Sequence, residues 1–91
     1  MGRYKVVLIE QAKDDILAHR KSGDKAINKR IDRIMCELSE HPETGTGRPE
    51  RLRFQMSGYW SRRLSLEHRL IYCIKEDVVE VIVVSAHGHY E

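Results

Sequence analysis

With 91 residues, the chain is long enough for one domain with one modest core, and we treat residues 1–91 as a single domain. Its 41% hydrophobic and 33% charged residues are typical of a soluble globular protein. No run of residues approaches the roughly 18 apolar positions of a membrane span, and the N-terminus lacks an apolar signal-peptide core. We therefore expect a cytoplasmic protein without membrane contact. The net charge of +2 is unevenly placed, because residues 46–72 hold six arginines and only two glutamates.

The first half of the chain predicts one strand and two helices. Residues 4–9 contain a short apolar run that is typical of a strand buried within a sheet. Helical spacing of apolar residues predicts helices over residues 11–21 and 25–40, separated by Gly23 as a left-handed C-terminal cap. We expect these helices to form an antiparallel hairpin on one sheet face. The apolar stripe of the second helix consists of Ile27, Ile31, Ile34, Met35 and Leu38.

The second half predicts a loop and four strands. Residues 42–50 contain two glycines and two prolines and are expected to be irregular. Strands are predicted over residues 51–55, over two runs within 58–72 that turn near 65–67, and over 78–85. The last strand is almost continuously apolar, which favours a position inside the sheet. The order β-α-α-β-β-β-β indicates an α+β fold with a mostly antiparallel sheet.

Arg69 lies in the middle of a predicted strand, on the same face as Ile71 and Cys73. A charge in that position must be paired, solvated or used, because an unpaired buried charge is costly. From the hairpin alone, a structural ion pair and a functional cation are equally open. The concentration of arginine over residues 46–72 favours an anionic partner, with nucleic acid first, over a merely solubilising face.

The histidines do not predict a metal site. Among the five histidines, His87 and His89 lie two residues apart on a strand-like tail and would point the same way. No third ligand is placed near them by the sequence. We therefore expect no metal and no cofactor.

Glu50, Arg69 and His89 together form a set that suits RNA cleavage. A carboxylate and an imidazole can take and give the two protons of the reaction, and a guanidinium can stabilise the phosphorane. Composition alone only permits this role. Glu50 can equally be a surface acid paired with Arg48 or Arg51, and His89 an ordinary terminal histidine.

Four segments resemble one known family in order and in spacing. They read Gly-Arg-Pro-Glu-Arg-Leu-Arg (47–53), Ser-Gly-Tyr-Trp-Ser-Arg-Arg (57–63), Glu-His-Arg-Leu-Ile-Tyr (67–72) and the ending His-Tyr (89–90). The chain resembles the YoeB/Txe toxins of the RelE superfamily, from bacterial toxin–antitoxin pairs. The chain departs from the family pattern at Arg51, which stands where members have a proline, and at Glu91, which follows the usual terminal tyrosine.

The resemblance implies a RelE-like fold and a ribosome-dependent mRNA endonuclease that cuts messenger RNA in the ribosomal A site. It also implies an acidic YefM-like antitoxin as partner, and leaves a homodimer open. By motif position, Glu50 corresponds to the general base, Arg69 to the transition-state cation, His89 to the general acid and Tyr90 to the aromatic that positions the RNA base. The arginines expected to contact RNA or the ribosome are Arg48, Arg51, Arg53, Arg62 and Arg63.

Two other functions remain open from the sequence. One is a toxin without nuclease activity on the same fold, such as a ParE-like gyrase poison, although the set of Glu50, Arg69, His89 and Tyr90 is not expected there. The other is a plain RNA- or ribosome-binding module that acts only through its charge. New message ends in cells that express the chain would support the nuclease alone.

Overall fold

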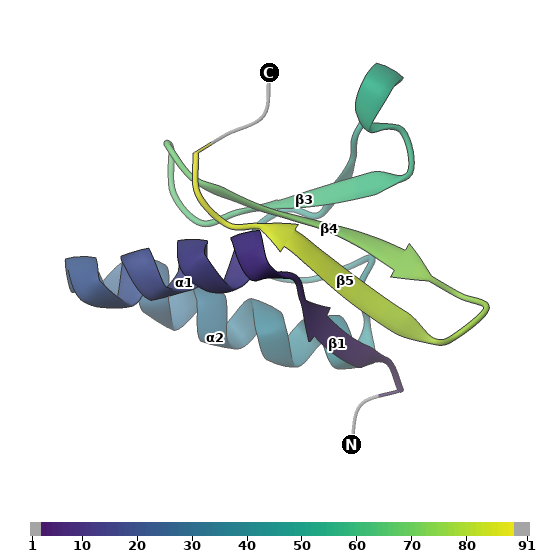
Figure 1. Cartoon of the computed structure of the whole chain (residues 1–91), viewed down its shortest axis with the longest axis horizontal. Helices are drawn as coiled ribbons and strands as arrows, with labels where there is room; N and C mark the ends of the chain where they lie inside the picture. The colour runs from purple at the N-terminus through teal and green to yellow at the C-terminus, as the bar shows by residue number, and fades with distance from the viewer. Residues whose placement is uncertain (1–2, 89–91) are drawn as a thin grey trace.

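The computed structural model describes residues 3–88 and packs two helices against one face of a five-stranded sheet (Figure 1). The elements are β1 (Lys5–Leu8), α1 (Glu10–Ser22), α2 (Lys25–Glu40), β2 (Glu50–Arg51), the 3₁₀ helix η1 (Phe54–Met56), β3 (Tyr59–Arg63), β4 (Arg69–Lys75) and β5 (Glu80–Ser85). This order confirms the predicted α+β fold and the helical hairpin. Neither helix in this part of the chain is long and apolar enough to cross a membrane.

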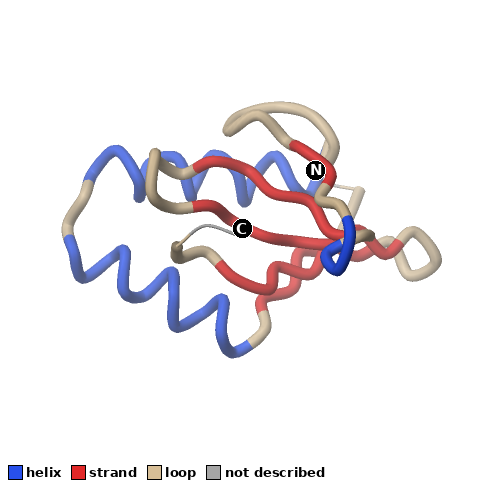
Figure 2. The backbone as a smooth tube through the Cα atoms, turned by 90° about the horizontal axis from the view of Figure 1, so that it is seen from above, coloured by secondary structure: helices blue, strands red, loops and turns tan. Residues whose placement is uncertain are grey.

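The sheet has the strand order β1-β5-β4-β3-β2, and its long central strands run side by side in Figure 2. The pair of β1 and β5 is parallel and the other three pairs are antiparallel. β5 has a neighbour on each side, as its apolar sequence predicted. The prediction that the first strand is buried within the sheet is wrong, because β1 is an edge strand. Its apolar side chains Val6 and Leu8 instead pack on the core beneath the helices.

The helix bounds are close to those predicted, because the capping residues and the apolar stripe indicate the same ends for each helix. α2 begins and ends as predicted, and the Asp24 carboxylate caps it by accepting the Ile27 N–H at 3.1 Å. Gly23 has the left-handed φ of 75° that ends α1. Each fully buried aliphatic side chain contributes about 1.5–3 kcal/mol, so this stripe holds α2 to the sheet. The fully or nearly fully buried residues of the stripe are Ile27, Ile31, Ile34 and Leu38.

The strand predicted over residues 51–55 is wrong over most of its length. In the strand pairing only Glu50 and Arg51 pair with β3, and η1 begins at Phe54. Phe54 has a φ of 59° and is 89% exposed, and a bulky residue in the left-handed region cannot continue a strand. Most of the residues predicted to form this strand therefore belong to the connection between β2 and β3.

Candidate active site

The pairing register of β2, β3 and β4 separates two rows of side chains. Glu50 pairs with Ser61, and Arg63 pairs with Arg69, so these four residues share the face of the sheet that points away from the helices. The alternate residues face the helices, because successive side chains of a strand point to opposite sides. The helix-facing row of β3, β4 and the start of their connection contains Trp60, Arg62, Leu64, Leu70 and Tyr72.

Glu50 and Arg69 meet on the open face. The Arg69 Nη1 lies 3.4 Å from Glu50 Oε1 and 3.4 Å from Ser61 Oγ. The side chains are 63% exposed for Glu50 and 25% exposed for Arg69. An exposed pair with this long contact adds only about 0–1 kcal/mol to stability. The ion pair that the sequence left open is therefore present, but it is loose and its charges face solvent.

The loop before β2 is bound to the end of β3, and two further arginines, one from each segment, lie near Glu50. Gly47 accepts the Arg63 N–H on its carbonyl at 2.7 Å, and its φ is 86°. A Cβ at Gly47 would lie 2.8 Å from the Arg63 carbonyl oxygen, so this close approach requires glycine. Arg48, Pro49, Glu50 and Arg63 then line a hollow of about 350 Å³ beside the pair.

The end of the described chain returns to the same place. The Arg69 N–H donates to the Gly88 carbonyl at 2.8 Å, and the Gly88 N–H donates to His68 Nδ1 at 2.8 Å. The predicted acid His89 and the predicted aromatic Tyr90 lie outside the described residues. The chain nevertheless brings the residue that directly precedes His89 into contact with the backbone of Arg69.

Arg62 is a correction to the predicted RNA-binding set, because its side chain is fully buried on the helix side of the sheet. Its five N–H groups have five acceptors, so no donor remains for a phosphate. Nη1 donates to Glu37 Oε1 at 2.6 Å and to the Thr46 carbonyl at 3.2 Å. Nη2 donates to the His41 carbonyl at 3.1 Å and to the Thr44 carbonyl at 2.7 Å. Nε donates to the Tyr72 hydroxyl at 3.2 Å.

The network and its burial also shift the pKa values of two partners of Arg62, Glu37 and Tyr72. Burial alone would raise the pKa of the Glu37 carboxyl, but hydrogen bonds from Thr46 and Arg62 outweigh it and lower the pKa below its usual value. Burial raises the pKa of Tyr72, against the opposing effect of Arg62. The Tyr72 hydroxyl donates to the Pro42 carbonyl at 2.6 Å. The network therefore ties α2, the loop after it, β3 and β4 together.

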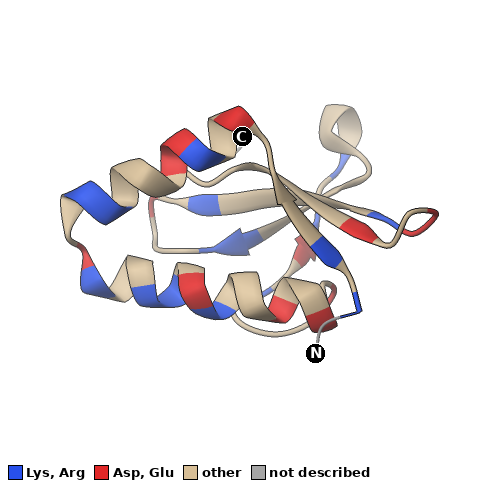
Figure 3. Cartoon of the chain, turned by 60° about the horizontal axis from the view of Figure 1, so that its bottom comes forward, with Lys and Arg blue, Asp and Glu red and all other residues tan. Residues whose placement is uncertain are grey.

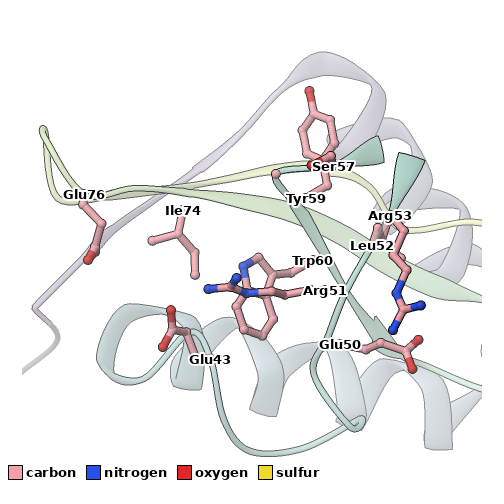
Figure 4. Close-up of a pocket in the computed structure, with 11 residues that line it drawn as sticks. Glu43, Glu50, Arg51, Leu52, Arg53, Ser57, Tyr59, Trp60, Ile74 and Glu76 are labelled. Carbon is pink, nitrogen blue, oxygen red and sulfur yellow. The ribbon is translucent and has the colours of Figure 1, made fainter. Parts of the chain in front are cut away.

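Arg51 and Arg53 border a second hollow at the β2 edge, with a volume of about 710 Å³ (Figure 4). The Arg51 guanidinium lies over the Trp60 ring at 5.4 Å, which directs it away from Glu50. The Arg53 side chain extends toward Glu50 in Figure 4. Arg53 therefore adjoins the open-face site, whereas Arg51 belongs to the opposite face.

Two features of the site were missed by sequence reasoning. The burial of Arg62 had a signal, because strand alternation puts it between the apolar Trp60 and Leu64. The contact of His87 with His19 and His68 had none, since these residues come from distant parts of the chain. Within residues 3–88, no group of three histidine, cysteine or acidic residues has a geometry that could hold a metal ion.

Positive charge also extends beyond the segment over residues 46–72. Lysine and arginine positions occur along α2 as well as on the sheet strands (Figure 3). Near the 42–50 loop they border a hollow of about 310 Å³, which shows that the basic surface is not confined to the site. The basic residues that line it are Lys29, Arg30 and Arg33.

Solved structures share this architecture. The YoeB/ParE toxin from Agrobacterium tumefaciens superposes with a TM-score of 0.85 and 30% identity, over 94% of this chain and 99% of that one. YoeB from Staphylococcus aureus matches with TM-scores of 0.79 as a dimer and 0.76 in complex with YefM. These matches have identities of 29% and 28%, and each covers 97% of this chain and 99% of that one. The helical hairpin on this mixed sheet is thus the fold of RelE-type toxins.

The sequence comparisons identify the family within this fold. The toxin YoeB of Escherichia coli O6:H1 is 36% identical over 86 residues, which are 94% of this chain and 99% of that protein. The model of the YoeB-like toxins of bacterial type II toxin–antitoxin systems matches residues 9–90. The chain belongs to this family of toxins.

Proposed function

We propose that the chain is the toxin of a type II module that acts as a ribosome-dependent mRNA endonuclease and cuts messenger RNA in the ribosomal A site. The observation that carries the proposal is the contact of Glu50 and Arg69 on the open face of the sheet, at 3.4 Å, beside the backbone that leads into His89. In the proposed site, Glu50 serves as the base and Arg69 as the cation, and His89, the residue that follows Gly88, is assigned as the acid.

The reaction needs no nucleophile from the protein. Glu50 takes the proton of the RNA 2′-hydroxyl, whose oxygen attacks the adjacent phosphorus. Arg69 stabilises the charge that develops on the non-bridging oxygens. The bond from phosphorus to the 5′-oxygen breaks as His89 donates a proton to that oxygen, and Tyr90 positions the base. The products are a 2′,3′-cyclic phosphate and a 5′-hydroxyl.

Arginine side chains around the pair support binding of the message and the ribosome. Arg48 and Arg63 line the hollow beside Glu50, and Arg53 extends toward it. A planar guanidinium can bind a phosphate through two parallel hydrogen bonds. The basic surface of α2 lies outside this hollow and suits the extended phosphate surface of ribosomal RNA.

The test is primer extension on a defined message from cells that briefly express the chain. Wild type and the variant Lys13→Ala, which changes an exposed charge on α1, are expected to produce new message ends within the coding region. Glu50→Ala and Arg69→Ala are expected to produce none above background at equal expression. A wild-type chain that stops growth without new message ends would contradict the proposal and favour a toxin that does not cleave RNA.

The partner of the toxin is an acidic, YefM-like antitoxin. The +4 segment over residues 46–72 and the structure of the Staphylococcus aureus YoeB–YefM complex support this assignment, and the dimer of that YoeB supports self-association. Co-purification with the product of a neighbouring gene should give a complex that does not cleave message. A complex that forms and retains full activity would contradict the assignment. Light scattering on the free toxin decides between monomer and dimer.

A further inference from the structure

Three imidazole rings from separate parts of the chain pack together where the tail leaves the sheet. His19 lies on α1, His68 directly precedes β4, and His87 follows β5. The ring centroids are 4.4 Å apart for His68 and His87, 4.8 Å for His19 and His68, and 5.3 Å for His19 and His87. The proposed reaction gives none of these three residues a role.

Two of these histidines and a buried aspartate hold the backbone at the end of the described chain. His19 Nε2 lies 2.6 Å from the Ala86 carbonyl, which only accepts, so this nitrogen carries the hydrogen. The Asp15 carboxylate accepts the Ala86 N–H at 3.0 Å. The Gly88 N–H donates to His68 Nδ1 at 2.8 Å, so that nitrogen is unprotonated. The strand β5 is thus followed by an anchored segment.

We propose that His68 is a positioning residue that fixes the chain leading into His89 beside Arg69, and that it does so only while its own ring is neutral. The proposal rests on the proposed function, in which His89 donates the proton to the leaving oxygen. Gly88 is held on both sides, by His68 at its N–H and by the Arg69 N–H at its carbonyl, and that carbonyl forms the peptide bond to His89. Misplacing a reacting group by about 1 Å can slow a reaction by up to about 10²-fold.

Protonation reverses the action of His68. A charged imidazole carries hydrogens on both nitrogens, so Nδ1 then faces the Gly88 N–H as a second donor. The hydrogen bond is lost and the two donors repel each other. His68 must therefore be neutral while His89 must be protonated, so the two histidines place opposite proton requirements on the same short stretch of chain.

The surroundings of His68 determine how readily it is charged. A proton on His19 or His87 disfavours a second proton on His68, because like charges lie close together. Within residues 3–88, the titratable or charged groups that contact or flank the ring include His19, His87, Glu67 and Arg69, and Asp15 binds the nearby backbone of Ala86.

Two substitutions distinguish the hydrogen bond from His68 to the Gly88 N–H from a role of the His68 ring in packing alone. In His68→Asn the amide oxygen can occupy the position of Nδ1 and accept the Gly88 N–H without titrating. In His68→Gln the same amide lies one methylene farther along the side chain and no longer reaches that position. His41→Gln is the matched control, because it changes an exposed histidine outside the cluster.

The first measurement is hydrogen exchange of the Gly88 amide by NMR in the free toxin, expressed as protection relative to an unstructured amide. Wild type, His41→Gln and His68→Asn are expected to protect it, and His68→Gln to lose at least about tenfold of that protection. Between about pH 7.5 and 5.5, where histidines ordinarily titrate, protection should fall in wild type and persist in His68→Asn. Equal protection in wild type and His68→Gln, or the same decline in His68→Asn as in wild type, would overturn the anchor.

The second measurement is single-turnover cleavage on programmed ribosomes. His68→Gln should lower the rate at saturation by about 10- to 10²-fold with little change in the concentration that half-saturates the ribosomes, and His68→Asn should restore most of that rate. A rate in His68→Gln equal to wild type, when His89→Ala is slow, would overturn the positioning role. A wild-type chain that cleaves no message contradicts the proposed function and the role of His89, whereas Gly88 exchange tests the anchor independently.

Discussion

Arg62 and Arg69 lie on adjacent strands of one sheet and have opposite environments. Arg62 is fully buried, and each of its five N–H groups has an acceptor at 2.6–3.2 Å. Arg69 is partly exposed, and its two side-chain contacts within residues 3–88 are both 3.4 Å long. The first arginine is saturated by the fold, whereas the second retains donors that a substrate can use.

The difference follows from the alternation of strand side chains. A shift by one residue along β3 moves a side chain from the helix face to the open face. Arg62 faces α2 and meets Glu37 there, while its neighbour Arg63 faces solvent beside Arg69. Residue type alone therefore does not distinguish the buried arginine from the solvent-facing one, but the face of the sheet on which each side chain lies does.

The largest effect is expected for Arg62→Ala. Removing one partner of a buried ion pair typically costs about 3–5 kcal/mol, and here Glu37 and three carbonyl groups would also lose a donor. Arg63→Ala, one residue along the same strand, should change the free energy of unfolding by less than about 0.5 kcal/mol. Urea unfolding of both variants measures this difference. Equal stabilities would mean that the network around Arg62 does not hold the fold.

The second effect concerns the open face. Arg69→Ala should slow single-turnover cleavage on ribosomes by about 10²–10³-fold, because it removes electrostatic stabilisation of the transition state. Its free energy of unfolding should change little, since the pair with Glu50 is loose. Arg69→Lys keeps the charge but loses the planar fork, so it should recover only part of the rate. A large loss of stability in Arg69→Ala would instead assign this arginine a structural role.

The buried network should also give stability a dependence on acid. Folding lowers the pKa of Glu37, so the stabilisation from its ionised form is complete above about pH 4.3 and is lost as the pH falls through the folded pKa. Glu37→Gln should be less stable than wild type at neutral pH, and the gap should narrow as the pH falls below about 4. Urea unfolding at several pH values tests this. A gap that stays constant would show that Glu37 does not titrate differently in the folded chain.

The smallest effect is expected at the arginines around the hollow. Arg48→Ala and Arg63→Ala should each weaken ribosome association and reduce its salt dependence by about one phosphate contact. Lys13→Ala should leave both unchanged, because Lys13 is an exposed residue of α1 that does not line this hollow. Co-sedimentation with ribosomes across a salt series measures the slopes. Slopes equal to that of wild type would exclude these two arginines from the contact.

Much of the fold was predictable because local and tertiary preferences agree. The apolar stripe and caps of α2 gave its bounds, and alternation gave the hairpin of β3 and β4. The edge position of β1 was not predictable, because an edge strand that packs on helices can have the same run of apolar residues as a strand inside the sheet. The strand predicted beyond Arg51 is wrong because Phe54 adopts a left-handed backbone and the chain turns there into η1. The motifs made Glu50 and Arg69 candidates for the site, but only the pairing register shows that the two side chains share a face of the sheet.

In the proposed reaction, Glu50 and Arg69 on this open face act on a nucleophile carried by the RNA, and His89 protonates the leaving oxygen. The most direct test is the chemistry of the ends produced when the wild-type toxin cleaves a defined message on programmed ribosomes. We expect a 2′,3′-cyclic phosphate on the upstream fragment and a 5′-hydroxyl on the downstream fragment, with both lost in Glu50→Ala. A 5′-phosphate on the downstream fragment would mean that water was the nucleophile, and it would contradict the roles assigned to Glu50 and His89.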